Sequence, residues 1–177
     1  MLRVPGGEYH IVSPDAPTGL SARLNDFLID RYEVTNEAFE GFVLGGGYAT
    51  DDHWAGIPPE VRRGFMDRTG LPGPRDWQRQ SFPEGQVSHP VTGGSWHEAS
   101  AYCSWAGKRL PTLYEWENTA RDGGTSRRGV LMPWVFTRSG SGDRRANFNS
   151  AGTVPVNAFP FGKSPYGAYG MAGNVRE

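Results

Sequence analysis

The stretch Ser95–Arg121 constrains the fold of this chain more than any other part of its sequence. Ser95 is followed three positions later by Glu98, which matches the S/T-x-x-E capping box, and Thr112 and Glu115 repeat the pattern. In this box the hydroxyl and the carboxylate satisfy backbone N–H groups that the first turn of a helix leaves unpaired. Two boxes in one short stretch therefore predict two helices with fixed starting points.

The first helix is predicted from Trp96 to Ala106 and ends at Gly107, because glycine tolerates the left-handed conformation after a helix. Its predicted buried face follows the i, i+3, i+4, i+7 spacing and consists of Ala99, Tyr102, Cys103 and Ala106. The second helix follows Thr112, and its predicted buried face consists of Leu113, Trp116 and Ala120.

Shorter elements are predicted on both sides of this stretch. A strand is predicted over Asn25–Tyr32, and a helix N-capped by Thr35 follows it, with Phe39, Phe42 and Val43 facing inward. Residues 48–89 are polar and rich in proline, which predicts a surface insertion with one helix from Pro58 or Pro59 to about Thr69. His53 and Trp54 are interpreted as solvated loop residues of this segment, and a further strand is expected over Val154–Phe159.

Composition favours a loop-rich α+β domain. Glycine and proline make up 25 and 14 of the 177 residues, which is more than a regular bundle or sandwich uses. The length suits a single domain over residues 1–177. A net charge of -1 gives no electrostatic reason to expect nucleic acid or an anionic membrane as a partner.

Cys103 is the only cysteine, so the chain forms no intrachain disulfide and needs no oxidising compartment. Its place on an apolar helix face predicts an inert, buried thiol. The sequence shows neither a charged-then-apolar leader nor an apolar run long enough to span a bilayer. These features predict a cytoplasmic protein without a membrane segment.

Three stretches together resemble one known family. The run P-V-T-G-G-S-W-H-E-A-S-A-Y-C-S-W-A-G-K-R-L-P-T-L-Y-E-W-E-N-T-A-R is similar to the signature of the formylglycine-generating enzymes, also called sulfatase-modifying factors. F-L-I-D-R-Y-E-V-T-N and Y-G-A-Y-G-M-A-G-N-V-R-E support the resemblance in the expected order. Asp67–Gln86 also resembles a branch of the family that is fused to bacterial serine/threonine kinases. The resemblance implies a C-type-lectin-like fold.

The resemblance implies an activity that these residues alone do not complete. Members of the family oxidise a cysteine of a sulfatase to Cα-formylglycine with copper and oxygen, and other relatives are non-haem iron sulfoxide synthases whose ligands lie in an attached domain. The copper-binding cysteine pair belongs to a later segment, so the chain is interpreted as a C-terminally truncated domain that is inactive alone. The competing hypothesis is a non-catalytic ligand-binding or sensor module attached to a kinase.

The resemblance also implies two calcium sites. One set of ligands corresponds to the Asn147 side chain and the carbonyl of Phe148, and the other to the carbonyls of Gly173 and Val175 with the carboxylate of Glu177. Gly170 stands where the family usually has Asn or Asp, which removes one oxygen ligand from the second site. Arg176 replaces a tryptophan that lines the substrate groove in the enzymes.

Overall fold

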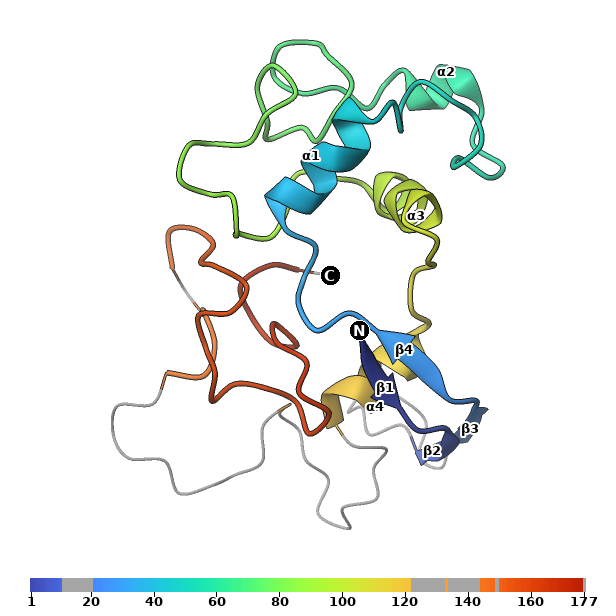
Figure 1. Cartoon of the computed structure of the whole chain (residues 1–177), viewed down its shortest axis with the longest axis vertical. Coiled ribbons are helices and arrows are strands. Elements are labelled where there is room, and N and C mark those ends of the chain that lie inside the picture. The colour runs from blue at the N-terminus through green and yellow to red at the C-terminus, as the bar shows by residue number, and fades with distance from the viewer. Residues whose placement is uncertain (11–20, 122–132, 134–143, 149, 177) are drawn as a thin grey trace. The chain divides into compact units, whose positions relative to one another are not determined.

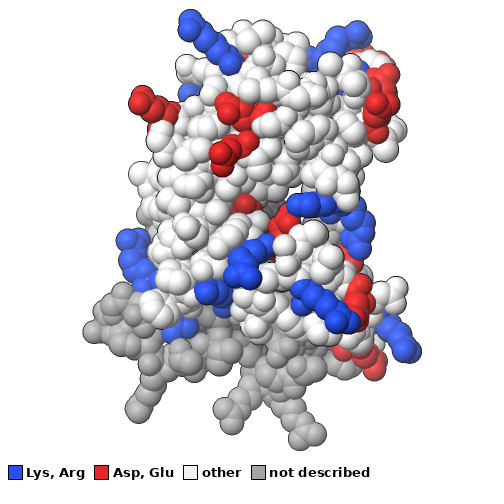
Figure 2. Space-filling model, in the orientation of Figure 1, with Lys and Arg blue, Asp and Glu red and all other residues white. Residues whose placement is uncertain are grey.

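A computed structural model describes residues 1–10, 21–121, 133, 144–148 and 150–176. The chain forms two compact units. Unit 1 comprises Met1–Glu33 and Pro111–Glu177, and unit 2 comprises Val34–Leu110. On the face shown in Figure 2, both signs of charge are interspersed, and neither covers the described surface.

Unit 1 combines two short antiparallel strand pairs with one helix (Figure 1). Strand β1 (Leu2–Val4) pairs with β4 (Phe27–Ile29), and β2 (Gly7–His10) pairs with β3 (Ser21–Leu24). Helix α4 (Leu113–Arg121) contacts β3. The apolar cluster of unit 1 is small and consists of Ala120, Ala168 and Met171, with Leu2 and Trp116 packed against them.

The buried face of α4 is mainly polar. Glu117 accepts a 2.8 Å hydrogen bond from the hydroxyl of Tyr9, and Thr119 donates its hydroxyl to the carbonyl of Glu115 at 2.8 Å. Burial, together with the neighbouring Glu117 carboxylate, raises the pKa of Tyr9 well above its ordinary value. The prediction that Leu113 is buried is wrong, since 67% of it is exposed. Apolar periodicity fails here because hydrogen-bonded polar groups face inward.

Unit 2 is built around aromatic side chains carried by two helices and the segment between them. Helices α1 (Asn36–Leu44) and α3 (Trp96–Trp105) contact each other, and α2 (Pro59–Arg62) is a single short turn between them in sequence. The core consists of Phe39, Phe42, Val43, Tyr48, Trp54, Trp77, Ala101 and Tyr102. The predicted inward residues of α1 and its cap at Thr35 are confirmed.

Both predicted capping boxes are confirmed. The hydroxyl of Ser95 accepts from the N–H of Glu98 at 3.2 Å, and the Glu98 carboxylate accepts from the N–H of Ser95 at 2.6 Å. Thr112 and Glu115 make the same pair of bonds. Gly107 has the left-handed φ of 69° that ends the first helix. Local capping chemistry therefore sets where these helices begin.

The face of α3 is rotated from the predicted one. Glu98, Ala101 and Tyr102 are its buried residues, whereas Cys103 is only partly buried. Glu98 turns inward because the hydroxyl of Tyr48 donates to its carboxylate at 2.6 Å.

The segment 48–89 contributes two tryptophans to the core of unit 2. Trp54 and Trp77 are 3% and 1% exposed, so the interpretation of Trp54 as a solvated residue is wrong. The predicted long helix is reduced to α2, because Gly64 weakens its continuation and the Asp67 carboxylate takes the N–H groups of Thr69 and Leu71 instead. That the segment is an insertion into the family fold stays a prediction.

Candidate functional site

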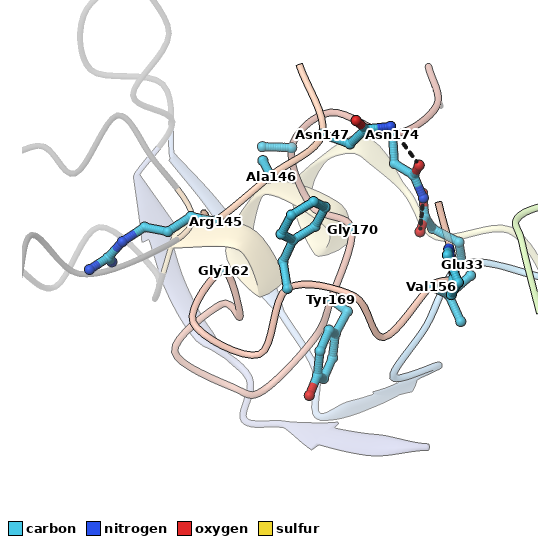
Figure 3. Close-up of a pocket in the computed structure, with 12 residues that line it drawn as sticks. Glu33, Arg145, Ala146, Asn147, Val156, Gly162, Tyr169, Gly170 and Asn174 are labelled. Atoms are coloured by element: carbon cyan, nitrogen blue, oxygen red, sulfur yellow. Dashed lines mark hydrogen bonds between the residues drawn. The ribbon is translucent and has the colours of Figure 1, made fainter. Parts of the chain in front are cut away.

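The candidate site is a small pocket in unit 1, formed by irregular backbone (Figure 3). It has room for about one water molecule or a small ion. Its lining residues are Glu33, Arg145, Ala146, Asn147, Pro155, Val156, Phe159, Gly162, Tyr169, Gly170, Ala172 and Asn174. The polar side chains among these residues are Glu33, Arg145, Asn147, Tyr169 and Asn174.

Asn174 connects the segments that form this pocket. Its side-chain oxygen accepts from the N–H of Val154 at 2.9 Å and from the amide of Asn147 at 3.2 Å. Its amide nitrogen donates to the Val154 carbonyl at 3.2 Å and to Glu33 Oε2 at 3.1 Å. The left-handed φ of 66° is tolerated by asparagine better than by most side chains. One residue thus joins its own segment to the loop 147–154 and to Glu33, which is distant in sequence.

The expected strand over Val154–Phe159 is absent from the structure. Asn174 satisfies both backbone groups of Val154 through its side chain, which is the role that a neighbouring strand would have played. Pro155 follows with no N–H to donate to a ladder. The side-chain amide therefore replaces a β-ladder at this point.

Two glycines allow the pocket walls to approach each other. A Cβ atom on Gly173 would lie 2.6 Å from the carbonyl oxygen of Asn147, and a Cβ atom on Gly170 would lie 2.6 Å from Cδ of Glu33. Both glycines have left-handed φ values, 76° and 70°. Side chains other than hydrogen at these positions would push the segments apart.

An aromatic pair anchors the other side of the pocket. The N–H of Tyr169 donates to the carbonyl of Arg31 at 2.9 Å, and the rings of Tyr32 and Tyr169 lie 4.8 Å apart. The ammonium of Lys163 lies 5.0 Å from the centre of the Tyr169 ring, within range of a cation–π contact. These contacts hold the segment after β4, which contains Glu33, against the segment that contains Gly170.

The structure brings together four of the five residues predicted to bind calcium. Asn147 is 7% exposed and its backbone oxygen accepts from the N–H of Asn174 at 3.0 Å, while Gly173 packs against Asn147 and Phe148. The carbonyl of Gly173 accepts from the N–H of Val175 at 2.9 Å. Glu177 lies outside the described residues. Coordination by this set stays a prediction.

Sequence reasoning missed Glu33 and Asn174 as residues of the site. Both belong to stretches that carry the family resemblance, R-Y-E-V-T-N and A-G-N-V-R-E, but neighbouring positions were assigned the ligand roles. The hydrogen bond that joins them spans 141 positions of sequence. A signal was present at Asn174, because asparagine tolerates the left-handed conformation and is common in turns.

In the described part of the chain no group of three or more His, Cys, Asp and Glu side chains is placed to hold a metal ion. Nor does any helix there have the length and apolar character needed to cross a membrane.

Fold and site together define a small α+β domain that carries a small pocket built from loops. The sequence matches the family model described as "Sulfatase-modifying factor enzyme 1-like domain" over residues 1–177, and the chain belongs to this family.

Three relatives show the range of proteins that contain this domain. The chain is 36% identical to the formylglycine-generating enzyme of Thermomonospora curvata over 217 residues, covering 100% of the chain and 69% of the enzyme. It is 32% identical to the inactive C-alpha-formylglycine-generating enzyme 2 of Bos taurus, again over 100% of the chain and 69% of that protein. It is also 34% identical to the serine/threonine-protein kinase Pkn1 of Chlamydia trachomatis serovar L2, covering 100% of the chain and 27% of the kinase.

The chain spans 48% and 56% of the length of the mouse and bovine formylglycine-generating enzymes that it also matches. The activity, substrates and partners of those whole proteins are therefore only proposals for this chain.

Proposed function

We propose that this chain is the scaffold of a formylglycine-generating-enzyme-like protein and that its own residues do not carry out cysteine oxidation. The observation that supports this is the single thiol. Cys103 lies on α3, partly buried against the aromatic core of unit 2. A copper site of the paired-cysteine type needs two thiolates, which are the soft ligands that Cu(I) prefers. The residues of this chain do not fit that site, and we assign it no oxidation step.

The test is a direct assay of the 177-residue chain. The chain is incubated with Cu(I), oxygen and a cysteine-containing peptide from a sulfatase, which is the partner class proposed for the whole protein. The formylglycine-generating enzyme of Thermomonospora curvata serves as the positive control. We expect an aldehyde-reactive probe to label the peptide only in the control. Copper-dependent aldehyde formation by this chain would overturn the proposal.

A second candidate is a non-catalytic binding module attached to a serine/threonine kinase. The similarity to Pkn1 over the whole chain favours it, as does the similarity to a relative that is named inactive. Sequencing the DNA on both sides of the coding region separates the two candidates. A kinase domain upstream without a cysteine pair downstream supports the module, and a downstream cysteine pair supports the enzyme scaffold.

We also propose that calcium binds at the two sites implied by the family resemblance and fixes the loops there. One site consists of the Asn147 side chain and the Phe148 carbonyl, and the other of the carbonyls of Gly173 and Val175 with the carboxylate of Glu177. Calcium takes oxygen ligands in flexible geometry, and Asn147, one of the proposed ligands, carries its amide into the lining of the pocket. When bound, calcium supplies only structural charge neutralisation. Isothermal titration of the metal-free chain with Ca²⁺ measures this directly, and we expect saturable binding that is weaker at the second site, which lacks a side-chain oxygen at Gly170.

A further inference from the structure

We propose that the loops held together by Asp67 in unit 2 form a docking surface for a short acidic segment of another protein. This Asp67 surface consists of four exposed side chains, those of Met66, Arg68, Leu71 and Arg79. The proposal concerns unit 2 alone, and it is independent of the proposals on cysteine oxidation and calcium.

Arg79 lies in a turn whose backbone conformation is unfavourable for its side chain. Arg79 and Gln80 have left-handed φ values of 53° and 60°, and the backbone groups of Gln78 and Ser81 close the turn with two hydrogen bonds of 3.0 Å. Two-residue turns with a positive φ at both central positions are usually built from asparagine and glycine. Residues held in such conformations cluster at ligand-binding sites. An arginine at this position therefore points to a function for its side chain.

Asp67 holds the turn in this conformation. Its carboxylate accepts from the N–H of Gln80 at 2.7 Å and from the N–H of Leu71 at 3.2 Å. The hydroxyl of Thr69 accepts from the N–H of Arg79 at 2.9 Å and itself donates to the Asp67 carboxylate at 2.7 Å. One buried carboxylate thus joins the loop 66–72 to the turn 78–81. A surface that is ordered before binding loses little conformational entropy when a partner docks.

The side chains of the Asp67 surface combine positive charge with apolar area. Among the described residues, the Arg79 guanidinium has no hydrogen-bond or ion-pair partner. Arg68 lies 3.9 Å from Asp76 and 61% of its side chain is exposed, so this ion pair is weak. Met66 and Leu71 are 44% and 41% exposed. Arginine and methionine are enriched in protein interfaces, which makes a protein segment the partner that fits.

Charge complementarity selects a short acidic partner. The planar guanidinium of arginine binds carboxylates through two parallel hydrogen bonds. Unit 2 as a whole has nine Asp and Glu residues against seven Lys and Arg residues, so its formal net charge is -2. A long polyanion such as a nucleic acid would meet this net negative charge, whereas a short acidic segment meets only the arginines of the surface. An apolar residue in that segment would pack on Met66 and Leu71.

The test begins with a phage-displayed library of random peptides selected on the 177-residue chain. We expect the enriched peptides to carry Asp or Glu beside an apolar residue such as leucine. Fluorescence anisotropy with one of these peptides then measures the affinity. Arg79→Gln removes the charge and should weaken binding about tenfold or more. Arg23→Gln removes the same charge from an exposed position of β3 in unit 1 and should leave the affinity unchanged.

Two further substitutions of Arg79 separate binding from stability. Glycine adopts a positive φ without strain, so Arg79→Gly should raise the melting temperature by about 2 °C or more while it abolishes peptide binding. Arg79→Glu should bind a peptide in which lysine replaces the acidic residues more tightly than the wild-type chain does. A purely structural role of Arg79 would not produce this exchange of specificity.

The outcomes that contradict the proposal are distinct. Selection of no peptide, or of peptides without acidic residues, overturns it, and so does an unchanged affinity in Arg79→Gln. A lowered melting temperature of Arg79→Gly overturns the premise that arginine occupies the turn for its side chain. Sedimentation of the wild-type chain as a dimer that Arg79→Gln dissociates would assign the surface to a second copy. Binding of oligothymidylate that is lost in Arg79→Gln would assign it to nucleic acid, and either result overturns the acidic protein segment as the occupant.

Discussion

The two units of this protein are stabilised by different interactions. Unit 2 buries aromatic rings against one another, such as Phe39 and Tyr102, which stack with centroids 5.3 Å apart. Unit 1 has a small apolar cluster and relies on directional hydrogen bonds around Asn174 and between Tyr9 and Glu117. Apolar burial is non-directional and tolerates local change, whereas a buried polar network depends on every partner. Substitutions should therefore have different consequences in the two units.

The largest effect is expected for Trp77→Ala in unit 2. Trp77 is 1% exposed and packs edge-on against Phe39 and Phe82. Removing a buried tryptophan deletes its contacts and leaves a cavity, which costs about 3–5 kcal/mol of unfolding free energy. Urea denaturation measures the loss, and hydrogen exchange with mass spectrometry should locate it in peptides from residues 34–110.

Trp96→Ala is the matched control for this prediction. Trp96 is 68% exposed, so its removal should change the free energy of unfolding by less than about 0.5 kcal/mol. Equal losses in the two variants would contradict the assignment of the aromatic core.

The next largest effect is expected for Asn174→Ala in unit 1. The substitution removes four side-chain hydrogen bonds and places alanine at a left-handed φ of 66°. We expect a loss of about 2–4 kcal/mol, because buried partners are left unsatisfied. Hydrogen exchange should increase in residues 144–176, in contrast to the Trp77 variant.

Two further variants separate the causes of that loss. Asn174→Gly relieves the backbone strain and should recover part of the stability, while Asn157→Ala removes an exposed asparagine of the same segment and should have little effect. Full recovery in Asn174→Gly would show that the hydrogen bonds contribute nothing.

The contrast between the units also explains what could be predicted from the sequence. The capping boxes at Ser95 and Thr112, the cap at Thr35 and the inward face of α1 depend on residues within a few positions of one another, and the structure confirms them. Family membership was likewise evident from contiguous stretches. Local chemistry sets these features, so a local pattern reveals them.

The missed features depend on contacts between distant positions. Glu33 meets Asn174 across 141 positions, and Trp54 is buried because rings from α1, the following loop and Phe65 surround it. Leu113 is exposed because the partner of α4 is a tyrosine hydroxyl from β2, so a polar face of the helix turns inward. Periodicity carries no information about which partner a helix meets. Of the residues that line the pocket, the sequence analysis singles out only Asn147 and Gly170.

Tyr48→Phe tests a polar contact placed inside the aromatic core. The hydroxyl of Tyr48 donates to buried Glu98 at 2.6 Å, and burial, with the nearby carboxylate, raises the pKa of Tyr48 above its ordinary value. Phenylalanine preserves the ring contacts with Phe42 and Trp54 but removes the donor. We expect a loss of about 1.5–3 kcal/mol in urea denaturation, the usual contribution of a hydrogen bond to a charged group. Tyr114→Phe, at an exposed position of α4, is the control.

The smallest effect is expected for Asp67→Asn, and it should depend on pH. Burial acts to raise the pKa of Asp67, but the N–H of Gln80 and the hydroxyl and N–H of Thr69 outweigh it and hold the pKa below the ordinary value of 3.8. A carboxyl whose folded pKa is lowered stabilises the fold above its unfolded pKa and loses that contribution as the pH falls through the folded value. The asparagine variant should therefore be less stable by about 1–2 kcal/mol near neutral pH, since the amide N–H₂ cannot accept from Gln80. The difference in unfolding free energy between wild type and variant should shrink as the pH falls below 3.8. If the difference stays constant down to the lowest pH at which both proteins fold, the stabilisation comes from packing around Asp67 and not from its charge.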